Sequence, residues 1–208
     1  MAYLFDTVVN GQGSAVGKAF FFKDSRYIIY DWATGGATGT PASLTAWGLG
    51  APFDTGVDAA LNGAGPSQNL AFFIRGDRYM SYSWLTSQVR GPYSLTTWNL
   101  PAGFASGVDA AITGQGAQSG KAYFFRGNQY VARDWSTGQT SGPSPLSGFR
   151  LTGRFLRGLH ACLNGERQFV GSTFFFRGTA FLRYEWATEA VAGPLHNAFW
   201  KLSGGIGS

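Results

Sequence analysis

Cysteine is nearly absent from this sequence, since only Cys162 among the 208 residues carries a thiol. One cysteine excludes an intrachain disulfide framework and a thiolate zinc cluster. Apolar runs reach only four or five residues, far short of the roughly 20 that a membrane-spanning helix needs. Met1 to Asn10 contains no basic flank and no long apolar run, so we expect no signal peptide. The expected location is the cytoplasm, or outside the cell after export without a signal peptide.

Histidine and charged residues are also scarce. The two histidines are His160 and His196, and charged residues make up 13% of the chain. No Ser/His/Asp order, metal-ligand cluster or phosphate-binding loop is evident. These shortages favour a non-enzymatic protein that requires no cofactor.

The formal net charge of +5 falls entirely in residues 105–208. Arg150, Arg154 and Arg157 lie close together there. Their spacing fits either an anion-attracting patch or a solvated loop face. Nucleic-acid binding would require more basic residues than these, so we expect no nucleic-acid partner.

Aromatic residues and glycine are abundant, in contrast. Aromatics form 16% of the chain, and its 31 glycines alternate with short aromatic runs. Apolar residues at 44% supply enough area to offset the ordering entropy, which excludes disorder. The alternation predicts many short strands joined by tight turns.

Four marker series repeat along the chain at an interval of 51 or 52 residues. The series are Trp32, Trp84, Trp135 and Trp186; Trp47, Trp98, Phe149 and Trp200; Lys23, Arg75, Arg126 and Arg177; and Pro41, Pro92, Pro143 and Pro194. Such agreement indicates four copies of one unit. We place the copies at approximately residues 3–54, 55–105, 106–157 and 158–208 of a single domain.

Each unit contains the signals of four strands. A short inner strand of small residues precedes a Gly-rich loop, and an aromatic strand follows. Gly76, Gly127 and Gly178 suit hairpin turns that need positive φ, whereas Asp24 predicts a different turn in the first unit. A third, alternating strand, a Gly-Pro turn and an outer strand at the aromatic-x-Leu triplet complete the unit. The prediction is an all-β fold, a four-bladed β-propeller with four strands per blade. A four-unit solenoid is the alternative, but the terminal units lack polar caps.

The repeat resembles the hemopexin-type repeat over essentially the whole chain. Unit three carries the best match, with Asp109-Ala-Ala, the run Tyr123-Phe-Phe-Arg-Gly-Asn and Asp134-Trp135. The resemblance implies a stand-alone propeller similar to plant seed albumins and microbial hemopexin-fold proteins. Domains of this kind serve as haem carriers, as docking modules of proteases, and as albumins that bind polyamines or haem.

The resemblance also implies a central tunnel lined by backbone carbonyls that can hold calcium or another ion. The carbonyls would belong to the residues that open the four inner strands, which are Asp6, Asp58, Asp109 and His160. A histidine at the fourth position departs from the pattern and argues against a symmetric cation ring. We expect any such ion to be structural.

The loops after the first and third strands of each unit are expected to share one face. They place neutral hydrogen-bonding residues near tryptophan, which suits the stacking and hydroxyl bonding of sugars. The predicted glycan-binding residues are Asn10, Trp32, Asn62, Trp84, Thr113, Trp135, Asn164 and Trp186. Packing between blades is the alternative role for the tryptophans, and simple turns are the alternative for the asparagines.

Lectin-like binding of glycans or glycoconjugates is therefore the leading functional hypothesis. A small-molecule binder for haem, through His160 or His196, or for a polyamine is the second, and a protein-docking module is the third. A homodimer is left open. The repeated acids Asp31, Asp134 and Glu185 are expected to pair with the repeated cations or to cap turns.

Overall fold

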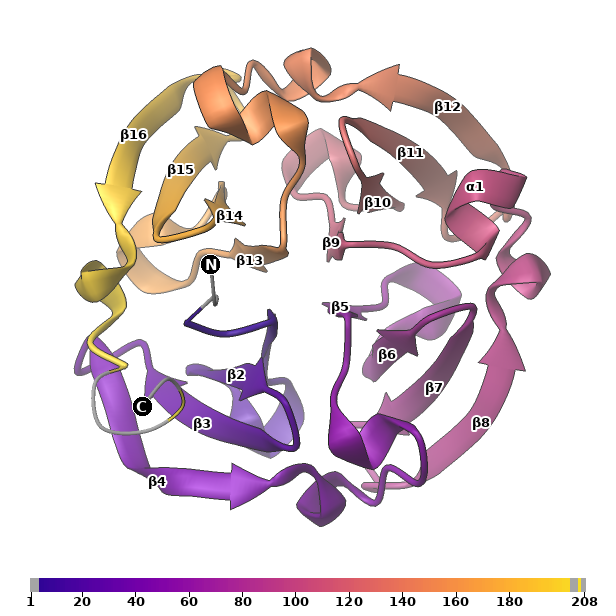
Figure 1. Cartoon of the computed structure of the whole chain (residues 1–208), viewed down its shortest axis with the longest axis vertical. Helices are drawn as coiled ribbons and strands as arrows, with labels where there is room; N and C mark the ends of the chain where they lie inside the picture. The colour runs from indigo at the N-terminus through magenta and orange to yellow at the C-terminus, as the bar shows by residue number, and fades with distance from the viewer. Residues whose placement is uncertain (1–3, 203–205, 207–208) are drawn as a thin grey trace.

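The computed structural model describes residues 4–202 and 206. In this part of the chain, four antiparallel sheets of four strands surround a central axis as blades (Figure 1). The first blade contains β1 (Thr7–Asn10), β2 (Lys18–Lys23), β3 (Arg26–Asp31) and β4 (Gly36–Ser43), and the second contains β5 (Ala59–Asn62), β6 (Leu70–Arg75), β7 (Arg78–Ser83) and β8 (Val89–Ser94). The third contains β9 (Ala110–Thr113), β10 (Lys121–Arg126), β11 (Gln129–Asp134) and β12 (Thr140–Pro145), and the fourth contains β13 (Ala161–Asn164), β14 (Ser172–Arg177), β15 (Ala180–Glu185) and β16 (Val191–His196). The predicted four-bladed propeller is confirmed.

In the described part of the chain, helical structure is confined to short connections. One α-helical turn, α1 (Ala102–Ala105), is joined by 3-10 helices at Gly13–Ala15, Leu44–Trp47, Phe53–Thr55, Gly65–Ser67, Leu95–Trp98, Gly116–Gln118, Leu146–Phe149, Gly153–Arg157, Arg167–Phe169 and Asn197–Trp200. Within residues 4–202 and 206, no helix is long and apolar enough to cross a membrane.

The inner strands β1, β5, β9 and β13 contact one another in turn around the axis. Small residues such as Ala59 and Ala110 are fully buried there, because four strands converge on little space. The aromatic second strands lie one step outward and are buried on both faces, as in the four consecutive buried residues of β2. The lack of alternation in their sequence therefore reflects their position between two neighbouring blades.

The hydrophobic core consists of four clusters, each shared by two adjacent blades. The second marker series supplies a ring to every cluster. Trp47, for example, packs edge-on against Phe73 and Trp84 of the second blade, at centroid distances of 5.2 and 5.5 Å. Such contacts add to the free energy gained by burial of aromatic area. The blades are thus held together by aromatic packing.

Trp200 joins the fourth blade to the first. Its ring is fully buried and lies 5.6 Å from the rings of both Phe21 and Trp32. The backbone carbonyl of Lys201 also accepts a hydrogen bond from Ala37 N at 3.3 Å. Cys162 is buried and free, so this junction depends on packing and hydrogen bonds.

Two local predictions need correction. The Gly-Pro pairs lie inside the outer strands, beside a register shift such as the one between Tyr79 and Ser81, because an outermost strand tolerates a missing N–H. The aromatic-x-Leu triplets instead begin in the 3-10 helices that follow.

In the first hairpin, Asp24 adopts a φ of 49°, close to the 56° of Gly76. The turn is therefore the same, with aspartate accepting the left-handed conformation.

Candidate functional site

The inner strands end at a closed ring of hydrogen bonds. Asn10 Nδ2 donates to the carbonyl of Asn164, Asn62 Nδ2 to that of Asn10, and Asn164 Nδ2 to that of Thr113, each at 2.8 Å. Thr113 Oγ1 donates to the carbonyl of Asn62 and completes the circle. Each blade is thereby tied to the next at the tunnel wall, so the four polar residues predicted to bind glycans lie together at one end of the tunnel.

Three of the predicted tryptophans donate their indole N–H groups directly to side chains of this hydrogen-bond ring. Trp32 Nε1 donates to Asn10 Oδ1 at 2.9 Å, and Trp84 Nε1 donates to Asn62 Oδ1 at 2.8 Å. Trp135 Nε1 reaches Thr113 Oγ1 at 3.3 Å. These three rings are at most 8% exposed. Each repeat therefore couples its inner strand to its own buried indole.

The fourth repeat inserts one extra residue into this chain of bonds. Trp186 Nε1 donates to Thr173 Oγ1 at 2.7 Å, and that hydroxyl donates to Asn164 Oδ1. Trp186 is half-buried and packs on Phe149. Since the hydrogen-bonding atoms of all four tryptophans are engaged within the protein, their role in glycan binding stays a prediction that would require the ring to open.

The tunnel is narrow at the ring. A cavity of about 30 Å³ lies there, lined by inner-strand residues such as Val8 and Leu61 and by the ring residues themselves. This volume is that of a single water molecule. The end of the tunnel on the loop face is therefore nearly closed.

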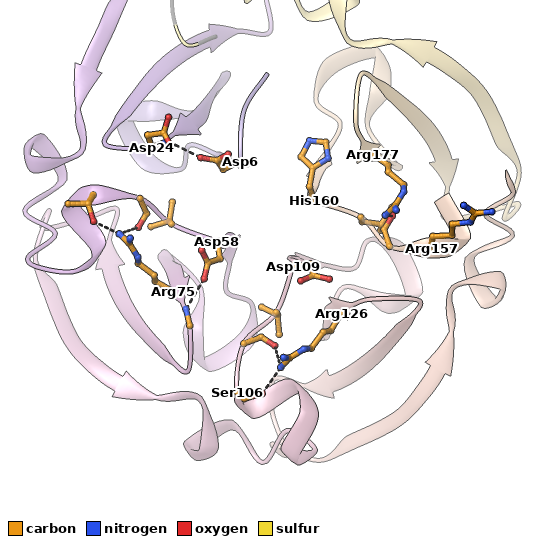
Figure 2. A pocket seen from close by; sticks show the side chains of 18 residues that line it. Asp6, Asp24, Asp58, Arg75, Ser106, Asp109, Arg126, Arg157, His160 and Arg177 are labelled. Carbon is orange, nitrogen blue, oxygen red and sulfur yellow. Dashed lines mark hydrogen bonds between the residues drawn. The ribbon is translucent and has the colours of Figure 1, made fainter. Parts of the chain in front are cut away.

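The opposite end opens into a funnel of about 600 Å³ (Figure 2). The residues that open the inner strands and those that close the second strands line it. The lining residues with ionisable side chains are Asp6, Asp24, Asp58, Arg75, Asp109, Arg126, Arg157, His160 and Arg177. A cavity of this size and polarity is the candidate functional site.

Three aspartates fix the hairpins around the funnel. Asp58 Oδ2 accepts a bond from Gly76 N, and Asp109 Oδ2 accepts one from Gly127 N, both at 2.7 Å. Within the described residues, no hydrogen bond reaches the second oxygen of either carboxylate. In Figure 2 these two side chains face the open centre. The hairpin bond thus holds each carboxylate in place and leaves one oxygen available to a ligand.

The equivalent carboxylate of the first blade has two partners. Asp6 Oδ2 accepts a bond from Asp24 N at 2.8 Å, and Asp6 Oδ1 pairs with Lys23 Nζ at 2.7 Å. Both oxygens of Asp6 are therefore engaged within the protein.

The arginines of the second strands clamp the segments that lead into their blades. Arg126 Nη1 donates to Ser106 Oγ at 2.6 Å and to the carbonyl of Gly107 at 3.0 Å. Arg75 makes the same pair of bonds to Thr55 Oγ1 and the carbonyl of Gly56. Sequence reasoning missed these clamps, although the constant spacing between the Asp and Arg series is a usable signal.

His160 occupies the aspartate position of the fourth blade. Its ring is 7% exposed and lies 5.4 Å from the ring of Phe5 and 6.3 Å from that of Phe176. The pKa of His160 is lowered to about 4, chiefly by burial and to a smaller extent by Arg177 and Lys23, against the opposing effect of Asp6. The imidazole is therefore neutral at pH 7.

The four residues predicted to present carbonyls to a tunnel ion all line the funnel, namely Asp6, Asp58, Asp109 and His160. Within residues 4–202 and 206, no group of three or more His, Cys, Asp or Glu side chains is arranged to hold a metal. Ion binding by their carbonyls stays a prediction.

Two of the repeated acids beside the tryptophans, Asp31 and Asp134, cap turns, as one of the two expectations had it. Glu185 instead accepts a bond from Ser172 Oγ at 2.8 Å and pairs with Arg183. Asp134 Oδ1 accepts bonds from Ser136 N at 2.9 Å and Thr137 N at 2.8 Å. The expected pairing of these acids with Lys23, Arg126 and Arg177 is wrong, because those cations point to the funnel end of the blades.

Comparison with solved structures places the fold. The chain superimposes on a hemopexin fold protein from cow pea with a TM-score of 0.77, over 96% of both chains at 18% identity. The chain has the hemopexin fold. A plant albumin from Cicer arietinum showing hemagglutination gives 0.77 over 95% of both chains at 15% identity. A plant lectin with two metal binding sites, also from Cicer arietinum, gives 0.76 over 94% of both chains at 16% identity.

Comparisons with models of protein families and with curated proteins find no match. At these identities, likeness to the solved hemopexin-fold proteins establishes the fold of the chain. The predicted resemblance to stand-alone hemopexin-fold propellers is confirmed at this level.

Proposed function

We propose that this hemopexin-fold propeller is a non-enzymatic carbohydrate-binding protein and that the funnel is its binding site. The observation that carries the proposal is the pair of carboxylate oxygens, one each on Asp58 and Asp109, that face a cavity of about 600 Å³. A carboxylate oxygen fixed in this way accepts hydrogen bonds from sugar hydroxyls, and charged acceptors form the stronger bonds.

Rigidity of the funnel supports the same function. The hairpins and lead-in segments around it are held by Asp and Arg side chains to main-chain atoms. A ligand therefore meets acceptors that are already ordered, which reduces the entropic cost of binding. Hemagglutination by one structural neighbour and the description of another as a lectin agree with a sugar ligand.

The loop face is a weaker candidate than the funnel. Its tryptophans are buried or half-buried and already hydrogen-bonded, as for Trp84 with Asn62. Sugar stacking there would need an exposed ring face. The two faces are separable by mutation because they lie at opposite ends of the tunnel.

A glycan array tests the proposal with the wild-type protein and two variants. Asp109→Asn keeps the acceptor for Gly127 N but removes the charge that faces the funnel, so we expect bound glycans to weaken about tenfold or more, which corresponds to about 1.4 kcal/mol. Trp186→Phe keeps a ring in place and alters only the loop face, so we expect binding within about threefold of wild type. An array without hits would refute carbohydrate binding, and loss confined to Trp186→Phe would move the site to the loop face.

Haem fits the funnel poorly. His160 is a neutral imidazole in the lining, but the apolar lining residues are Val57, Val108 and Leu159, whereas a porphyrin requires a wide apolar slot. A polyamine would meet arginines as well as aspartates there. We expect haem titration to give the same Soret band with the wild type and with His160→Ala. We expect added spermine to leave glycan binding unchanged.

A further inference from the structure

The fourth repeat departs from the others at two positions that face the funnel. Arg157 stands where the second and third repeats have Thr55 and Ser106, and His160 stands where the first three repeats have aspartate. The hydroxyl that accepts a bond from the second-strand arginine is thus replaced by a cation, and a carboxylate is replaced by a neutral imidazole. Both changes make this side of the funnel more positive.

Arg177 is left with fewer partners by these replacements. Its Nη1 donates to the carbonyl of Gly158 at 2.7 Å, the bond equivalent to that between Arg126 and Gly107. Among the described residues, the hydroxyl bond of Arg75 and Arg126 has no counterpart at Arg177, because Arg157 carries no acceptor. The rest of the guanidinium is available for another group.

The arginines of the segment before β13 differ in whether they have an acidic partner. Arg150 pairs with Glu189 at 2.8 Å on the outer surface. For Arg154, Arg157 and Arg177, no carboxylate of the described part of the chain lies within 4.0 Å. Arg157 is exposed and lines the funnel together with Arg177. Of the three arginines for which the sequence left open an anion-attracting patch or a solvated loop face, Arg157 therefore lies in the candidate site.

Charge is consequently uneven around the funnel. The second and third blades each contribute one aspartate and one arginine, and the first contributes Asp6 and Asp24. The fourth contributes Arg157 and Arg177 without an acid. Figure 2 shows both arginines and His160 on one side, with Asp58 on the other side of the opening and Asp109 at its lower edge.

We propose that the fourth-blade side of the funnel binds the carboxylate of an acidic sugar through Arg177 and Arg157. This inference rests on the proposed carbohydrate site and specifies its ligand class. Guanidinium groups bind carboxylates through paired, charge-assisted hydrogen bonds. The sugar hydroxyls then face the free oxygens of Asp58 and Asp109. A wholly neutral sugar would leave the two arginines without an anionic partner, whereas a polyanion would meet the aspartates of the first three blades.

The test uses matched ligands that differ in one carboxylate. Titration calorimetry compares methyl glucuronide with methyl glucoside and sialyllactose with lactose, at low and at physiological salt. Arg157→Ser restores the residue of the third repeat, and His160→Asp restores its aspartate beside Arg177. Arg90→Ser removes the same charge from exposed β8 as a control.

We expect the carboxylated member of at least one pair to bind tenfold or more tightly. Arg157→Ser and His160→Asp should each reduce that preference to threefold or less while neutral sugars bind as before, and Arg90→Ser should preserve it. Neutral sugars that bind in the funnel without any carboxylate preference would overturn this inference and leave the proposed function standing. Equal losses in Arg157→Ser and Arg90→Ser would also overturn it, since they indicate attraction by net charge alone. No binding of any sugar would refute the proposed function itself.

Discussion

The indole N–H of Trp84 donates to the side-chain oxygen of Asn62, whose amide donates in turn to the first blade at the carbonyl of Asn10, each at 2.8 Å. One asparagine therefore satisfies a buried indole and ties two blades together. The same arrangement recurs with threonine at position 113, so the repeats themselves show which substitutions the ring accepts.

Asn62→Ala should lower the free energy of unfolding by about 2–3 kcal/mol, because it removes a bond between blades and leaves the buried Trp84 N–H without an acceptor. Asn62→Thr should cost clearly less, since Thr113 performs the same task in the next repeat. Urea unfolding followed by tryptophan fluorescence measures both. Equal losses in the two variants would contradict this role for the ring.

Trp47→Ala should destabilise the protein by about 3–5 kcal/mol through the cavity left between the first and second blades. Trp47→Phe should cost less than about 1.5 kcal/mol, because Phe149 fills the equivalent position and the buried Trp47 Nε1 has no hydrogen-bond partner in the described residues. Thermal and urea unfolding of both variants test the difference. A phenylalanine variant as unstable as the alanine variant would show that the two interfaces differ in shape.

Asp24→Gly should raise stability by about 0.5 kcal/mol. The backbone at Asp24 has a φ of 49°, a conformation that glycine adopts at the other three hairpins without a Cβ penalty. Its side chain is 79% exposed and lies 3.9 Å from Lys23, so little is lost with it. Asp24→Ala keeps the penalty and serves as the control in urea unfolding. A glycine variant no more stable than the alanine variant would assign the aspartate a larger role.

Acid should destabilise the fold through His160. Its pKa is lowered from 6.5 to about 4 by burial, so the unfolded chain binds a proton more readily than the folded one. The stability contributed by the neutral ring is complete above pH 6.5 and is lost as the pH falls through about 4, a total of a few kcal/mol. The groups that act on the ring are Asp6, Lys23 and Arg177.

Urea unfolding of the wild type and of His160→Asn between pH 7 and pH 4 isolates this effect from that of the carboxylates. The difference in unfolding free energy between the two proteins should shrink steadily over this range. A constant difference would show that His160 carries the same charge in the folded and unfolded states.

The sequence predicted the fold well because the repeat interval reports the architecture directly. Four aligned copies of an aromatic strand followed by a hairpin glycine have few geometric solutions, and closure around an axis buries all of them. Bond partners were harder to predict. Asn10 and Trp32 stand 22 residues apart, as do Asn62 and Trp84, and this spacing fits an exposed sugar site as well as an internal bond.

The funnel was harder still to predict, because its walls depend on irregular segments between blades. Arg126 binds a carbonyl and a hydroxyl of residues 103–107, and their placement depends on the path of α1. Sequence periodicity does mark the unusual repeat, however. Arg157 replaces the hydroxyl residue of the second and third repeats, His160 replaces the aspartate of the other three, and both lie in the candidate site.

Each sheet is made of four consecutive strands, and none borrows a strand from another repeat. Within residues 4–202 and 206, the boundary between the first and fourth blades is built like the other three, from packed side chains and a hydrogen bond between inner strands, here from Asn10 to the carbonyl of Asn164. Mechanically, the propeller is four separate sheets that adhere through their faces, and in the described residues no strand crosses a boundary between blades. Stretching or heating should therefore separate whole blades from one another before the strands of any one blade come apart, because the strand-to-strand hydrogen bonds of each sheet lie within one repeat.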